Sequence, residues 1–145
     1  MTLHLIKLSV GVDDVEHLAR IQAKRLADAR RQGATPELRH VTRNTPRQAD
    51  AILDGGSIYW VIKGFIRARQ RIIAIRRVDR RDDRPACALV LDPTLVRTEL
   101  RSFRPFQGWR YLAPTSAPKD AAGGRGSAGE APAAMAAELK HLGLI

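Results

Sequence analysis

The clearest alternation of hydrophobic and polar positions lies in residues 57–71. The even positions from 58 to 68 are apolar or glycine, whereas the odd positions from 59 to 71 combine Val61 with aromatic and basic side chains. Because successive strand residues point to opposite faces, this pattern predicts one long strand region with a core face and an aromatic-basic face. Gly64 interrupts the pattern, and we expect a bend or bulge there. The residues expected in the core are Ile58, Trp60, Ile62 and Ile66.

A helix is expected between Asp13 and Gly33. Asp13 can accept hydrogen bonds from the free amides of the first turn, and Glu16 can reach back to complete a capping box. Apolar residues then follow helical spacing, while basic residues gather on the other faces. Gly33 is a natural stop after the last turn.

A second, short helix is expected directly before the strand region. Thr45 as the cap, Pro46 at the first helical position and Gln48 in a capping box favour a helix start. The glycine pair at 55–56 ends it. A helix of little more than two turns is not stable alone in water, so it must pack on the sheet.

Several other short runs have strand character, and the charged segment 76–85 between two of them predicts a hairpin loop. This density of strands predicts an α+β fold, with a small, bent antiparallel or mixed sheet or an open barrel and two or three flanking helices. The additional strand segments are 3–12, 39–43, 72–75, 86–91 and 95–100.

The composition changes after Ala113. Residues 1–113 are expected to form a single globular domain, because their hydrophobic segments can supply one core. Residues 114–131 are rich in Pro, Ala, Gly and Ser, which is typical of a flexible linker. Residues 132–145 are expected to form a short C-terminal helix.

The net charge changes the functional picture. The 145 residues carry a formal charge of +10, and Lys stands only at positions 7, 24, 63, 119 and 140, so Arg supplies most of it. Arg matches phosphate oxygens with a planar fork of donors, so a polyanionic partner is the first expectation. The alternative is a solvated basic surface that binds nothing.

Other classes of function find little support. Cys87 is the only cysteine, and the four histidines lack zinc-site spacing, so we expect neither a disulfide nor a metal or other cofactor. No signal peptide or membrane-spanning run is apparent, so a soluble protein of a reducing cytoplasm is expected. No phosphate-binding loop, catalytic triad or spaced carboxylate pair is present, and we do not expect an enzyme.

The segment FRPFQGWRYL, residues 103–112, is dense in aromatic and basic residues. Its proline and glycine exclude a regular central strand. One interpretation is an aromatic plug that closes the end of the sheet. The other is a stacking platform, in which Trp109 and Tyr111 receive bases while Arg104 and Arg110 receive phosphates.

The combination of HVTRNTP, ILDGGSIYWVIKG, RARQRI, LVLDP and RPFQGWRYL resembles an uncharacterised bacterial protein family, domain of unknown function 1489. The opening HLIKLSVGVDDVE is similar to that family's N-terminus. The resemblance covers about residues 2–112, leaves the tail outside it, and implies no activity. A weaker resemblance links residues 49–63 and RQRIIAI to PUA-like domains, including ASCH and EVE domains. It implies an open PUA-like β-barrel and binding of RNA or a modified base beside the short helix.

The leading hypothesis is therefore a nucleic-acid-binding domain, with RNA as the first expectation. Rings can stack on bases and cations can neutralise phosphates. One alternative is a small nucleobase or nucleoside hydrolase of the ASCH-like type, using a buried Lys63 with Thr42 or Glu99. Another is a protein-interaction module that binds a partner through the C-terminal helix. The candidate nucleic-acid-binding residues are Arg43, Tyr59, Lys63, Arg67, Arg69, Arg71, Trp109 and Arg110.

Overall fold

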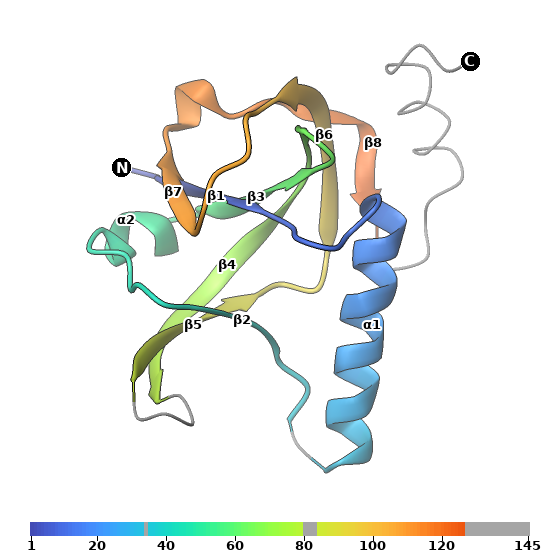
Figure 1. Ribbon diagram of the computed structural model, residues 1–145, viewed down its shortest axis with the longest axis vertical. Helices are drawn as coiled ribbons and strands as arrows, with labels where there is room; N and C mark the ends of the chain where they lie inside the picture. The colour runs from blue at the N-terminus through green and yellow to red at the C-terminus, as the bar shows by residue number, and fades with distance from the viewer. Residues whose placement is uncertain (34, 80–83, 127–145) are drawn as a thin grey trace.

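The computed structural model describes residues 1–33, 35–79 and 84–126 (Figure 1). Within these ranges the chain forms eight strands, two α-helices and one 3-10 helix. The elements are β1 (His4–Leu8), α1 (Val15–Arg31), β2 (Leu38–Thr42), α2 (Ala49–Leu53), β3 (Ser57–Ile62), β4 (Phe65–Asp79), β5 (Pro85–Leu91), β6 (Leu95–Ser102), β7 (Trp109–Leu112), η1 (Pro114–Ser116) and β8 (Asp120–Gly126).

The sheet is organised around the long strand β4. The main path runs β2-β5-β4-β3-β1-β7, and β6 pairs with both β4 and β8. The first part of β4 pairs with β3 and β6, and its second part pairs with β5. Strand β1 is parallel to β3 and antiparallel to β7, so the sheet is mixed. Within the described residues the path has two ends, at β2 and β7, and the sheet is open.

The expectation of one long strand across Gly64 is wrong. Lys63 and Gly64 both have positive φ, at 52° and 81°, and form a two-residue turn. Such turns suit the right-handed twist of a β-hairpin. The chain therefore reverses, and β3 and β4 run antiparallel with Ile62 opposite Phe65.

The expected core face is confirmed for Ile58, Trp60 and Ile62, whereas Ile66 packs in a second cluster that covers the opposite face. The four predicted core residues of β3 and β4 are at most 3% exposed. On the other face, Tyr59 and Val61 are buried in a second apolar cluster with Ile6, Ile66 and Leu112. Phe103 and Phe106 pack against this cluster, as the plug interpretation expected.

Both helices exist, but their caps differ from the expectation. Asp14 rather than Asp13 caps α1, because its Oδ1 accepts a 2.7 Å hydrogen bond from the His17 amide. Helix α2 is shorter than expected and starts after Gln48 without a side-chain cap. At Gly56, a Cβ would lie 2.2 Å from the Leu3 carbonyl oxygen, so only glycine permits this close approach to the chain before β1.

A buried polar network joins α1 to the sheet. Gln22 of α1 and Gln70 of β4 exchange two hydrogen bonds of 2.8 Å through their side-chain amides. Gln70 also accepts a 2.9 Å bond from the Trp60 indole and donates a 3.1 Å bond to the Asp92 carbonyl. Because Gln70 is fully buried, each of these partners is needed to offset the cost of removing its amide from water.

The segment expected to be a linker begins with regular structure. Residues 114–116 form η1, and residues 120–126 form β8, paired antiparallel with β6. Small residues did not prevent a strand here, because backbone hydrogen bonds to β6 do not depend on side chains. The helix expected at 132–145 lies outside the described residues.

Replacing Gln70 by leucine should lower the free energy of unfolding by about 2–4 kcal/mol. The change leaves the Gln22 amide and the Trp60 indole buried without their partner, and unsatisfied buried groups cost about 1–3 kcal/mol each. Urea unfolding measures the loss. The exposed Gln32→Leu is the control and should change stability by less than about 0.5 kcal/mol. The double variant Gln22→Leu/Gln70→Leu should cost less than the sum of the two single changes, and strict additivity would contradict the network.

Candidate functional site

Three of the predicted binding residues are engaged inside the fold. Tyr59 is 5% exposed, and burial raises the pKa of its phenol. Arg67 is 8% exposed, donates a 2.6 Å hydrogen bond to the Ile62 carbonyl and lies over the Phe65 ring. Arg69 binds both carboxylate oxygens of Asp120, at 2.7 and 2.8 Å. These side chains therefore do not form the open aromatic-basic face that the alternation predicted.

Three other predicted binding residues are exposed, and they lie on different elements with different neighbours. Lys63 lies in the β3–β4 turn, with its ammonium 3.4 Å from an Asp13 carboxylate oxygen. Arg110 covers the ring of Phe106, and Arg71 is exposed near the middle of β4. The hydrolase alternative required a buried Lys63, and the structure gives it an exposed one.

The two remaining predicted residues, Arg43 and Trp109, line one wide pocket, which we call the outer pocket. It has a volume of about 800 Å³ and lies between the end of β2 and the start of β7. The Trp109 indole donates a 3.0 Å hydrogen bond to the Asn44 carbonyl, and its ring meets Tyr111 edge to face at 5.0 Å. Trp109 is half-buried, so its ring is fixed in place while part of it stays accessible.

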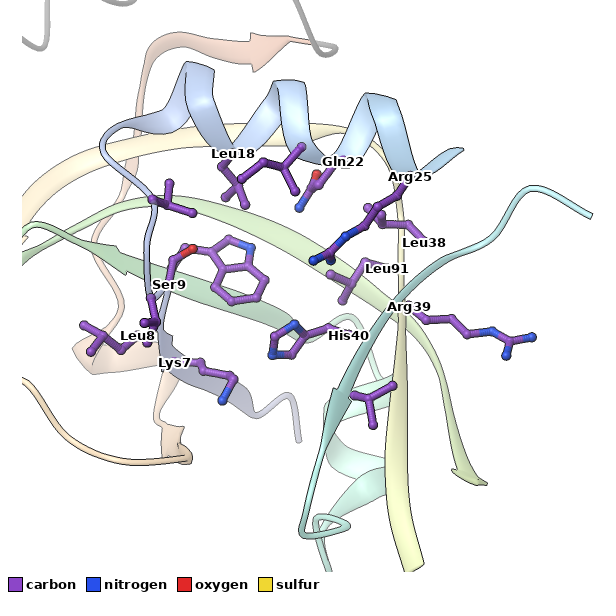
Figure 2. A pocket seen from close by; sticks show the side chains of 15 residues that line it. Lys7, Leu8, Ser9, Leu18, Gln22, Arg25, Leu38, Arg39, His40 and Leu91 are labelled. Atoms are coloured by element: carbon purple, nitrogen blue, oxygen red, sulfur yellow. The ribbon is translucent and has the colours of Figure 1, made fainter. Parts of the chain in front are cut away.

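A second pocket of about 300 Å³, the inner pocket, adjoins the outer one (Figure 2). Helix α1 lies over it, β1 and β2 form its sides, and the buried Trp60 forms a wall. Lys7 and Val41 line both pockets, so the two are continuous along the sheet.

Lys7 stands between two tryptophans. On the neighbouring strands it is paired with Trp60 of β3 on one side and Trp109 of β7 on the other. Residues paired across adjacent strands project from the same face. We call this arrangement the Trp60–Lys7–Trp109 row. It places a cation between the aromatic walls of the inner and outer pockets.

Among the described residues, every charged side chain that lines either pocket is basic. The inner pocket has Lys7, Arg25 and Arg39, and the outer pocket adds Arg43. Arg39 is paired with Glu37 at 2.8 Å and points away from the inner pocket in Figure 2. Within the described residues, Lys7 and Arg25 have no carboxylate partner, and burial lowers the pKa of Lys7.

His40 faces this pair of cations from β2. Its Nε2 atom is buried and has no hydrogen-bond partner within the described part of the chain. Its ring meets Trp60 edge to face at 5.1 Å. Burial, together with the charges of Lys7 and Arg25, lowers the pKa of His40 from 6.5 to about 4, so the ring is neutral at pH 7.

Sequence patterns offer only weak signs of the pocket residues Lys7, Arg25 and His40. Lys7 is the one charge in an otherwise apolar strand, and Arg25 belongs to a basic helix face that is usually only solvated. His40 is one of four scattered histidines. Nothing in their spacing links positions 7, 25 and 40, because α1, β1 and β2 meet only through the fold.

The described residues lack two further features. No group of three His, Cys, Asp or Glu residues in them could hold a metal ion. Nor does any helix in the described ranges have the length and apolarity that crossing a membrane requires.

Comparison with known proteins identifies the family. The model of the family "Protein of unknown function (DUF1489)" matches residues 5–145, and the chain belongs to that family. The match extends to the last residue, so the expectation that the tail lies outside the family pattern is wrong. No curated protein and no solved structure matches the chain.

Replacing Arg69 by glutamine should lower the free energy of unfolding by about 1–2 kcal/mol, because hydrogen bonds to charged groups contribute about 1.5–3 kcal/mol and partial exposure weakens this pair. The change removes the bidentate contact that joins β4 to the start of β8. Arg71→Gln, at an exposed site two residues away, is the matched control for urea unfolding and should differ from the original protein by less than about 0.5 kcal/mol. Equal losses in both variants would mean that the Asp120 contact contributes nothing.

Because of His40, the free energy of unfolding should decrease as the pH is lowered from about 6.5 to about 4. The pKa of His40 is about 4 in the folded protein, and the ordinary value of 6.5 applies to the unfolded chain. Between pH 4 and pH 6.5 the unfolded chain therefore binds more protons than the folded protein. The contribution is complete above pH 6.5 and is lost as pH falls to about 4, to a total of about 3 kcal/mol. In His40→Phe this part of the pH dependence should be absent. Identical slopes for the two proteins over this range would show that His40 is not held neutral beside Lys7 and Arg25.

Proposed function

We propose that this member of the DUF1489 family binds single-stranded nucleic acid, RNA in the first instance, along the outer and inner pockets. The observation that carries the proposal is the Trp60–Lys7–Trp109 row, flanked by Arg25 and Arg43, in two pockets that no carboxylate of the described residues lines. Single-strand recognition combines a basic groove along the backbone with rings on which bases stack. This site supplies both.

The parts of the site divide these tasks. Trp109 is the candidate stacking ring, because it is fixed by Asn44 and only half-buried. Arg43 and Lys7 lie beside it and can contact phosphates on either side of a stacked base. Trp60 is 3% exposed and acts as a wall rather than as a platform.

Two wider features support the same function. The formal charge of +10 attracts a polyanion from a distance and speeds its association. Residues 49–63 and the following RQRIIAI form a short helix that ends in glycine and then strands with Lys and Arg. This order of elements resembles that of PUA-like domains, many of which bind RNA. That resemblance is an analogy of fold, and the site residues carry the argument.

Binding should be measured with a fluorescently labelled single-stranded RNA of mixed sequence, by anisotropy at several salt concentrations. Affinity should fall steeply as salt rises, because cations that contact phosphates release counterions. Trp109→Ala should weaken binding by about 5- to 100-fold, since a stacked base is worth about 1–3 kcal/mol. Arg43→Gln should weaken binding and reduce the salt slope by about one.

The matched control is Arg77→Gln, which removes an exposed arginine of β4 that lines neither pocket. It should change affinity less than twofold. Equal effects of Arg43→Gln and Arg77→Gln would indicate attraction by net charge alone and would contradict a defined site. Arg67 and Arg69 are unsuitable for this test, because their contacts hold the fold together.

A further inference from the structure

The inner pocket brings together three polar groups from three elements. They are the Lys7 ammonium of β1, the Arg25 guanidinium of α1 and the His40 imidazole of β2, which Figure 2 shows around one space. Within the described residues the two cations lack a carboxylate, and His40 Nε2 is buried without a partner. Buried polar groups in proteins are nearly always hydrogen-bonded, so an unpaired one in a side chain that lines a cavity points to a ligand nearby.

The charge of the pocket indicates the kind of ligand. Lys7 and Arg25 supply two positive charges, and no carboxylate in the described part of the chain lines the pocket to offset them. A phosphodiester inside a nucleic-acid strand carries one negative charge, whereas a phosphate monoester carries about −1.5 to −2 at pH 7 and offers three acceptor oxygens. Arg25 can bind two of these oxygens with its fork, and Lys7 can act as a point charge. The His40 ring lines the same space and is neutral at pH 7, so Lys7 and Arg25 supply the contacts to the phosphate.

The position and size of the pocket favour the end of a strand. Its volume of about 300 Å³ is at the small end of ligand sites. It joins the outer pocket at Lys7, so a chain lying over Trp109 can end there. A phosphate in the inner pocket and a base on Trp109 would then share Lys7 between them.

We propose that the inner pocket binds the terminal phosphate monoester of a nucleic-acid strand whose adjoining nucleotides lie in the outer pocket. This inference rests on the proposed function and adds to it a preference for one kind of strand end. Arg25 distinguishes the phosphorylated end from a hydroxyl end, and Lys7 serves both pockets.

The test compares three RNAs of one sequence, carrying a 5′-phosphate, a 3′-phosphate or neither. One phosphorylated RNA should bind about tenfold or more tightly than the RNA without a terminal phosphate. In Arg25→Gln this ratio of affinities should fall to about one. In Lys24→Gln, which removes an exposed charge from the neighbouring position of α1 outside the pocket, the ratio should stay as in the original protein.

A second measurement follows the His40 ring by NMR. Burial lowers the pKa of His40 most, and the charges of Lys7 and Arg25 lower it further; binding of the favoured RNA should raise this pKa by one unit or more, because the dianion offsets those two charges. Lys7 and Arg25 are the charged groups that face the ring from β1 and α1, so Arg25→Gln should raise this pKa in the free protein and reduce its response to RNA. A purely structural His40 would titrate identically with and without RNA.

The outcomes separate this inference from the proposed function. Equal affinity for all three RNAs, with binding still dependent on Trp109, would overturn the terminal-phosphate site and leave the proposed function intact. Binding of inorganic phosphate or a mononucleotide at His40, with no RNA bound, would overturn the strand-end proposal and the proposed function together. A phosphate preference that persists in Arg25→Gln would place that recognition elsewhere and overturn the inference.

Discussion

The paired side-chain amides of Gln22 and Gln70 are the interaction on which the rest of this structure depends. They join α1 to the middle of β4 and fix the Trp60 indole through the same Gln70 oxygen. Because Gln22 and Trp60 both line the inner pocket, the network that positions the helix also shapes the cavity. A polar contact can do this where an apolar one could not, since its geometry admits one arrangement of helix and sheet.

The many arginines have different tasks, and their partners decide which. Arg67 and Arg69 donate to Ile62 and Asp120, and so they hold strands and turns in place. Lys7, Arg25 and Arg43 line pockets in which every charged side chain is basic. A high net charge therefore says little about where a polyanion would bind, and the proposed location follows from the cations that stay unpaired among the described residues.

The alternation in residues 57–71 correctly predicted a core face and the burial of Trp60, but it suggested the wrong face for a ligand. The odd-numbered Tyr59 is covered by the second apolar cluster. The row proposed to bind the ligand lies on the even face, where β1 inserts Lys7 between Trp60 and Trp109. The pattern within one strand could not show this, because β1 and β7, which supply Lys7 and Trp109, are distant from β3 in the sequence.

The sequence by itself determined most elements and their approximate ends. Helix α1 begins at an acidic cap and ends at a glycine, and the turn residues after α2 precede β3. Most strands follow from local apolar runs. These features depend on backbone propensities and on residues a few positions apart. Only the tertiary structure decided that the chain reverses at Lys63, that residues 120–126 pair with β6, and that Lys7, Arg25 and His40 face one cavity. Those outcomes depend on which distant strands share hydrogen bonds, and local sequence does not specify such partners.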